Sequence, residues 1–207
     1  MDSKFVVNIG RQLGSGGREI GEKLAARLGI DFYDKELINL ASEESGLCRE
    51  FFEKADEKAS QGIIGGLFGM RFPFISDGAM PATNCLSNDA LFKVQSDVIR
   101  RLAAEKSCLF VGRCADYILK DRHPLRVFVY ADKASRMARC REKGHETLTD
   151  MQLWRKIRTV DRHRAKYYSF YTGLSWGDKF NYDLCINTTN AQIKDIVEAL
   201  TRLVASR

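Results

Sequence analysis

The segment best suited to chemistry lies between residues 9 and 21 and reads IGRQLGSGGREIG. Its closely spaced glycines let the backbone bend so that successive N–H groups face one point. A helical pattern that begins at Gly17 adds the positive end of a helix dipole to those amides. The turn therefore predicts an anion cradle formed by Gly14, Ser15, Gly16, Gly17, Arg18 and Glu19. The alternative is a plain strand-to-helix turn that binds nothing, because glycine-rich turns are common.

This turn departs from the standard phosphate-binding loop, which reads G-x-x-x-x-G-K-S/T, or G-K-x-T in a related form. When the two are aligned on Gly16, Gly17 stands where the lysine belongs and Arg11 replaces the first glycine. Glu19 replaces the hydroxyl residue that binds magnesium. Arg18 is the obvious substitute cation, since a guanidinium can bind phosphate oxygens through two parallel hydrogen bonds.

A second group of charged residues lies in the dense basic zone at 155–166. Arg158, Asp161 and Arg164 are spaced three residues apart, which places all three along one face of a helix. On that face the two arginines could approach a transferring phosphoryl group while Asp161 holds one of them in place. A solvated basic helix with ordinary ion pairs is the competing interpretation.

The elements that must position these residues follow from hydrophobic periodicity. Nearly continuous apolar runs predict five buried strands, at about 4–9, 31–33, 107–111, 125–130 and 182–186. Helical spacing predicts the intervening helices, at about 17–28, 35–45, 49–60, 88–105, 147–170 and 189–204, with a short helix around 115–120 and another that begins at Asp132. Strands that alternate with helices and lack polar alternation indicate an α/β fold with a parallel sheet covered on both faces. Residues 61–87 are rich in Gly, Pro, Ser and Asn and predict a loop.

Composition narrows the function classes. The 207 residues suffice for one α/β domain, and the net charge of +6 is dispersed rather than gathered in a Lys/Arg tail. That distribution favours a phosphate-handling pocket over a nucleic-acid-binding arm. No apolar run reaches the length of a membrane helix, and the N-terminus reads as a first strand rather than a signal peptide. The six cysteines form no C-x-x-C pair, so we expect no zinc site, reduced thiols and a cytoplasmic location.

Three ordered segments carry a resemblance to a known family: GSGGREIGEKLAARLGIDFYDKELI, FVGRCADYIL and IRTVDRHRAKYYSFYTGLSWGDKFNYDLCINTT. Together they resemble cytidylate kinases and, more closely, the cytidylate kinase-like family, whose phosphate loop is altered. The resemblance implies a P-loop NTPase fold, with a five-stranded parallel sheet in the order 2-3-1-4-5 flanked by helices. It also implies a single domain over 1–207, with an acceptor-binding insertion at about 35–87 and a helical lid at about 145–180.

The same resemblance implies roles for individual residues. The cradle with Arg18 would hold the triphosphate of ATP, and Arg18, Arg158, Asp161 and Arg164 would form the catalytic set. On the acceptor side, the implied residues are Asp34, Arg113 and Asp116. The implied cofactors are ATP and Mg²⁺, with no dedicated protein metal site. The implied partners are small nucleotide substrates, and CMP or dCMP is the implied acceptor.

Three other interpretations stay open at this point. The acceptor could be another small phosphate-bearing molecule. The chain could also be a non-catalytic, nucleotide-binding regulatory protein of the same fold, which the missing lysine and hydroxyl favour. A nucleic-acid-binding module is disfavoured because the strands are apolar and buried. The sequence makes no prediction about the oligomeric state.

Overall fold

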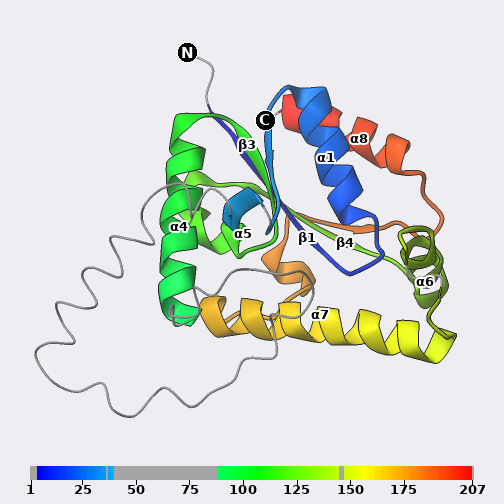
Figure 1. Ribbon diagram of the computed structural model, residues 1–207. Coiled ribbons are helices and arrows are strands. Elements are labelled where there is room, and N and C mark those ends of the chain that lie inside the picture. The colour runs from blue at the N-terminus through cyan, green and yellow to red at the C-terminus, as the bar shows by residue number, and fades with distance from the viewer. Residues whose placement is uncertain (1–3, 36, 40–87, 145–146, 207) are drawn as a thin grey trace, which may run out of the picture.

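The computed structural model describes residues 4–35, 37–39, 88–144 and 147–206 (Figure 1). Most of the predicted acceptor-binding insertion, including the helix expected at 49–60 and the loop expected at 61–87, lies outside the described residues. The helix expected at about 35–45 is described only at 35 and 37–39, whereas the other predicted elements fall on described segments.

The sheet has five parallel strands in the order β2-β3-β1-β4-β5, which confirms the predicted P-loop topology. The strands are β1 (Val6–Arg11), β2 (Asp31–Tyr33), β3 (Cys108–Val111), β4 (Leu125–Tyr130) and β5 (Leu184–Asn187). β1 is central and pairs with β3 on one side and β4 on the other. Because the strands are parallel, their carboxyl ends share one edge, where ligands bind in sheets of this type.

Helices cover both faces of the sheet, which explains why its strands are apolar throughout (Figure 1). α1 (Gly17–Leu28) and α8 (Ile193–Ala205) pack over Val7 and Ile9 on one face. α4 (Asn88–Glu105) and the short α5 (Ala115–Ile118) pack over Val6 and Phe110 on the other. Successive residues of β1 thus serve opposite cores, as the alternation of side chains along a strand requires.

The segment predicted as a helical lid contains one long helix, α7 (Asp150–Thr172), which we call the lid helix and which follows α6 (Lys133–Glu142). Its role as a lid stays a prediction. A capping box between Thr149 and Gln152 starts α7, and Gly173, with φ of 71°, ends it. Figure 1 shows α7 running along one end of the molecule from α6 to α4. Its C-terminal half is anchored to the body, because Tyr168 is buried in the core and Tyr171 stacks on Phe92 with ring centroids 3.8 Å apart.

Two short 3₁₀ helices, Lys120–Arg122 and Lys179–Asn181, complete the described elements. The largest difference from a predicted boundary is at α8, which begins at Ile193 and not at Thr189. The other predicted bounds that fall on described segments differ by three residues or fewer. The side-chain oxygen of Asn187 accepts hydrogen bonds from the amide and hydroxyl of Thr189, and this local turn delays the helix.

Candidate active site at the phosphate loop

The loop between β1 and α1 has its carbonyl groups held by donors from other elements. Arg136 Nε of α6 donates to the carbonyl of Leu13 at 2.8 Å, and Arg139 Nη1 donates to that of Gly14 at 3.4 Å. The hydroxyl of Thr188, which follows β5, donates to the carbonyl of Ser15 at 2.8 Å. Three successive carbonyls are therefore occupied from outside, and this fixes the orientation of the peptide groups between them.

The amides of the same loop include open donors. Gly14 and Gly16 have φ of 77° and 83°, a left-handed conformation that glycine adopts without strain. Within the part of the chain that the structure describes, neither of their amides has a hydrogen-bond acceptor. Two open amides beside the N-terminus of α1 suit a phosphate group, so this loop fits the triphosphate of ATP.

Asp161 of the lid helix is bound directly to the phosphate loop. One carboxylate oxygen accepts the amide of Leu13 at 2.8 Å, and the other pairs with Arg136. Burial raises the pKa of the Asp161 carboxyl, and the Leu13 amide and the Arg136 charge oppose that rise. Asp161 thus joins the loop, α6 and α7 at one point, and its contact with Arg136 was not foreseen from the sequence.

The two lid arginines differ in their surroundings. Arg164 Nη1 lies 3.5 Å from Asp161 Oδ1 and donates to the carbonyl of Arg11 at 3.1 Å, so it holds the start of the loop. Arg158 lies on the same helical face but is exposed, and it has no ion pair or hydrogen bond with any described residue. The predicted pairing of Asp161 with a lid arginine is therefore present for Arg164, while Arg158 is available to a ligand.

Arg18 contacts Asp34, which was predicted to lie on the acceptor side. Its guanidinium lies 2.8 Å (Nη2) and 2.9 Å (Nε) from Asp34 Oδ2, beyond the end of β2. Asp34 is buried, and its other oxygen accepts the amide of Leu37 at 3.1 Å, as an N-cap does. The structure thus brings together a residue predicted for the donor and one predicted for the acceptor. The assignment of Arg18 as the substitute for the lysine stays a prediction.

Glu19 is engaged by two lysines and does not form part of a metal cluster. Its carboxylate lies 2.8 Å from Lys23 and 3.7 Å from Lys143, and the hydrogen bond from Lys23 lowers its pKa. The described residues contain no group of three or more His, Cys, Asp or Glu side chains that could hold a metal ion. In enzymes that act on phosphates, Mg²⁺ is usually bound by one or two carboxylates together with substrate phosphates and water, so a dedicated protein cage is not required.

Arg113 is presented by a strained turn after β3. Gly112, Arg113 and Cys114 are all left-handed, with φ of 77°, 58° and 56°. Two consecutive non-glycine residues in this region cost about 1–3 kcal/mol each, a strain typical of functional loops. The Arg113 guanidinium lies 5.5 Å from the ring centroid of Tyr167 on the lid helix. The turn therefore directs a cation toward the space between β3 and α7.

Asp116 links the body of the protein to the lid helix. It is only 5% exposed, and it accepts a hydrogen bond from the hydroxyl of Tyr168 at 2.7 Å. Burial raises the pKa of its carboxyl, and the Tyr168 hydroxyl partly offsets that rise. Its predicted roles, to orient Arg113 or to contact the acceptor, stay predictions.

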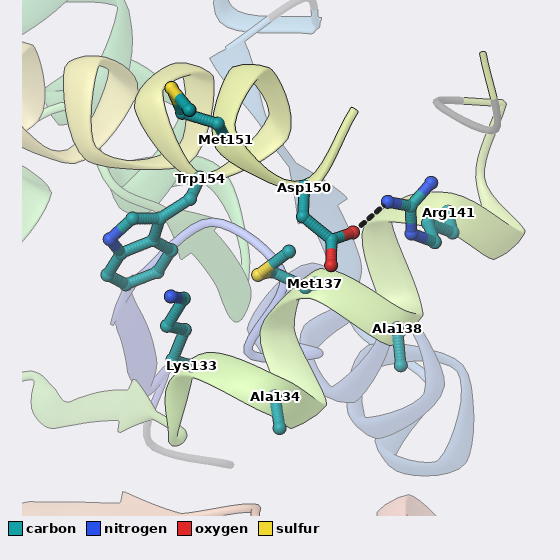
Figure 2. A pocket seen from close by; sticks show the side chains of 8 residues that line it. All are labelled: Lys133, Ala134, Met137, Ala138, Arg141, Asp150, Met151 and Trp154. Carbon is teal, nitrogen blue, oxygen red and sulfur yellow. Dashed lines mark hydrogen bonds and ion pairs between the residues drawn. The ribbon is translucent and has the colours of Figure 1, made fainter. Parts of the chain in front are cut away.

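A groove of about 720 Å³ lies elsewhere, between α6 and α7 (Figure 2). Figure 2 shows Lys133 pointing toward Trp154, whose ring centroid lies 5.3 Å from the Lys133 ammonium. Arg141 and Asp150 pair across the far end of the groove. No residue predicted for the active site lines it, so this groove is distinct from the phosphate loop.

The sheet order, the glycine loop clamped by a basic lid helix, and the arginine turn after β3 define the P-loop kinase class of fold. Within that class, the sequence matches the model of the cytidylate kinase-like family over residues 6–190, and the chain belongs to that family. Membership places it among the nucleotide and small-molecule kinases, which are phosphotransferases. No curated protein matches the sequence significantly.

Solved structures support the same fold. An uncharacterized protein from Eubacterium ventriosum is 24% identical with a TM-score of 0.72, and the match covers 99% of this chain and 100% of that one. A shikimate kinase from Bacteroides thetaiotaomicron is 14% identical, with a TM-score of 0.54 and coverage of 98% and 99%. A shikimate kinase from Acinetobacter baumannii, in complex with shikimate, is 15% identical, with a TM-score of 0.51 and coverage of 99% and 95%.

None of the described helices is long and apolar enough to cross a membrane.

Proposed function

We propose that this protein transfers the γ-phosphoryl group of ATP to a nucleoside monophosphate, with CMP or dCMP as the acceptor. The observation that carries the proposal is the phosphate loop, whose carbonyls are held from outside while the amides of Gly14 and Gly16 stay open to a ligand. Membership of the cytidylate kinase-like family supports the choice of acceptor. Mg²⁺ supplies charge neutralisation between the phosphates when it is bound with ATP.

The reaction needs alignment rather than a strong base, since the acceptor phosphate is already an anionic nucleophile at neutral pH. The amides of the loop and the N-terminus of α1 would orient the donor triphosphate. Arg113, held by its strained turn, would bind the acceptor phosphate. Arg158 of the lid helix would bind the transferring phosphoryl group. Arg164 and Asp161 hold the phosphate loop to the same helix by hydrogen bonds.

The pairing of Arg18 with Asp34 has a place in the same scheme. It connects the first turn of α1, where the donor would lie, to the end of β2, where the acceptor would lie. Because Asp34 is buried and also caps the following turn, the pair would fix the distance between the two substrates. In this role Arg18 and Asp34 would align the donor and acceptor substrates with each other.

A coupled assay of ADP release tests the proposal, with ATP and Mg²⁺ and with CMP, dCMP, UMP, AMP and GMP as acceptors in turn. We expect release that depends on CMP or dCMP and exceeds the acceptor-free rate. Release that depends on a different phosphate-bearing acceptor would correct the substrate and keep the phosphotransferase assignment.

A non-catalytic nucleotide-binding role is the second candidate, and two observations favour it. Gly17 occupies the position of the lysine, and the Glu19 carboxylate is bound by Lys23. Tight ATP binding in calorimetry, together with no ADP release for any acceptor, would favour that role over catalysis.

A further inference from the structure

Arg11 and Gly17 compete for the same space. A Cβ atom at Gly17 would lie 2.5 Å from Cβ of Arg11, 3.1 Å from Cβ of Val129 and 3.2 Å from Cγ of Arg11, so the nearest obstacle is the arginine. Contacts between carbon atoms settle at about 3.5–4.0 Å, so a side chain at position 17 is incompatible with the arginine as it stands. Position 17 is where the standard loop carries its lysine, and position 11 is where that loop carries its first glycine. Compared with the standard loop, this chain has a cation at position 11 in place of glycine and a glycine at position 17 in place of the cation.

The side chain of Arg11 extends from the phosphate loop to the acceptor side. Its stem lies against Gly17 at the start of α1, and a Cβ at Gly112 would lie 2.2 Å from its Nη1 atom. Gly112 precedes Arg113 at the end of β3. The Arg11 guanidinium therefore crosses the carboxyl ends of β1 and β3, between the cradle and the arginine turn, and glycine at position 112 leaves room for it.

The backbone of Arg11 is held as well. Its carbonyl accepts a hydrogen bond from Arg164 Nη1 at 3.1 Å, which ties the start of the loop to the lid helix. Arg18, the other cation near the loop, is bound to Asp34 on the acceptor side, and its side chain is 59% exposed. Of these two arginines, Arg11 is the one whose stem replaces a lysine side chain at position 17.

We propose that Arg11 supplies the phosphate-binding cation that the standard loop takes from its lysine. This inference rests on the proposed function, because it needs a triphosphate in the cradle. A guanidinium differs from an ammonium in offering two parallel hydrogen bonds, so from its place between the two ends Arg11 can bind donor phosphate oxygens in a fixed orientation.

The test is a set of four variants, measured by calorimetry with Mg²⁺-ATP and with inorganic tripolyphosphate. Arg11→Ala should weaken the binding of both ligands by about 10- to 100-fold, the usual loss for a charge-assisted pair. Gly17→Lys alone should lower the melting temperature, because the new side chain meets Arg11. The double variant Arg11→Gly/Gly17→Lys restores the first glycine and the lysine of the standard pattern and should recover most of the affinity. Arg27→Ala, at the exposed far end of α1, is the matched control.

The outcomes separate this inference from the proposed function. If the wild type binds ATP and Arg11→Ala binds it equally well, Arg11 is not the cation and the kinase proposal stands. If the wild type binds neither ATP nor tripolyphosphate, both proposals fail. Should Arg11→Ala unfold, the double variant decides, since it also lacks the arginine: recovered affinity supports the exchange of positions 11 and 17, and a folded double variant without affinity overturns it.

Discussion

The proposed donor and acceptor ends of this site are built in different ways. At the proposed donor end the candidate ligand-binding groups are backbone amides, and side chains from α6, α7 and the segment after β5 hold the loop through hydrogen bonds. At the proposed acceptor end the predicted ligand-binding groups are side chains, namely Asp34 after β2, Arg113 after β3 and Asp116 in α5. A backbone cradle fixes one chemistry, phosphate binding, whereas side chains can change with the acceptor.

The two buried carboxylates on opposite sides of this division show the same contrast. Asp161 has an arginine partner that is itself buried, and it connects three elements at the loop. Asp116 has a tyrosine hydroxyl and no such ionic partner among the described residues. Neutralising the buried carboxylate should therefore destabilise the protein at Asp161 and not at Asp116, and two of the following predictions test that difference.

The largest effect should come from the lid arginine that is open to a ligand. Arg158→Ala should lower kcat by roughly 10³-fold, the size found for arginines that stabilise a transferring phosphoryl group, and should change the Kd for ATP little. Steady-state kinetics and calorimetry measure the two quantities. Arg155→Ala, on an exposed part of the same helix, is the control. An equal loss in kcat and in ATP affinity would show that Arg158 binds the ground state.

Next in size is the clamp at the back of the loop. Asp161→Asn keeps an acceptor for the Leu13 amide but leaves Arg136 buried without a counter-charge, which costs about 3–5 kcal/mol of folding free energy. We expect a fall in melting temperature of about 10 °C together with weaker ATP binding. Asp150→Asn breaks an ion pair at an 81% exposed aspartate of the same helix and should shift melting far less. Equal shifts in the two variants would mean that the clamp adds no stability.

The acceptor end should respond in a different kinetic constant. Arg113→Ala should raise the KM for the acceptor by about 10- to 100-fold, because a charge-assisted contact to its phosphate is lost. The Kd for ATP should stay within about twofold if the donor end is as independent as the structure indicates. Arg100→Ala on the exposed face of α4 is the control. A parallel loss of ATP affinity would show that the two ends share Arg113.

The fold could be predicted from the sequence because its strands and helices follow local patterns. α1 and α4 have the predicted bounds, and the strand order followed from the resemblance that the ordered motifs carry. The glycine turn and the lid face were also local patterns. Arg136, Arg139 and Thr188 were not foreseen as carbonyl donors, because they meet the loop only through tertiary packing.

The loop also shows how far a local pattern reaches. The departure from the standard motif at positions 11, 17 and 19 was visible in the sequence, but the direction of each side chain was not. Proximity along the chain favoured Arg18 as the substitute cation. In the structure the Arg11 stem lies against Gly17, and the Arg18 guanidinium is bound to Asp34. The side chain that fills the space at position 17 therefore comes from six residues earlier and not from the adjacent residue.

The smallest expected effect concerns Asp116 and the pH dependence of stability. Burial raises the pKa of this carboxyl above its ordinary 3.8, so the folded state binds its proton more tightly than the unfolded state does. That contribution to stability is present below pH 3.8 and is lost as the pH rises through the folded-state pKa. At pH 7 the ionised carboxylate is therefore unfavourable, and Asp116→Asn, which still accepts from Tyr168, should be more stable by about 1 kcal/mol.

Urea unfolding of the wild type and Asp116→Asn between pH 4 and pH 8 measures this difference, which should shrink toward the acid end. Tyr168→Phe is the matched variant, because it keeps the charge and removes its hydroxyl partner, and it should be less stable than the wild type at pH 7. A destabilised Asp116→Asn at pH 7 would mean that the buried charge is itself favourable. The acceptor end would then resemble the donor end, where the buried carboxylate is needed as the partner of another residue.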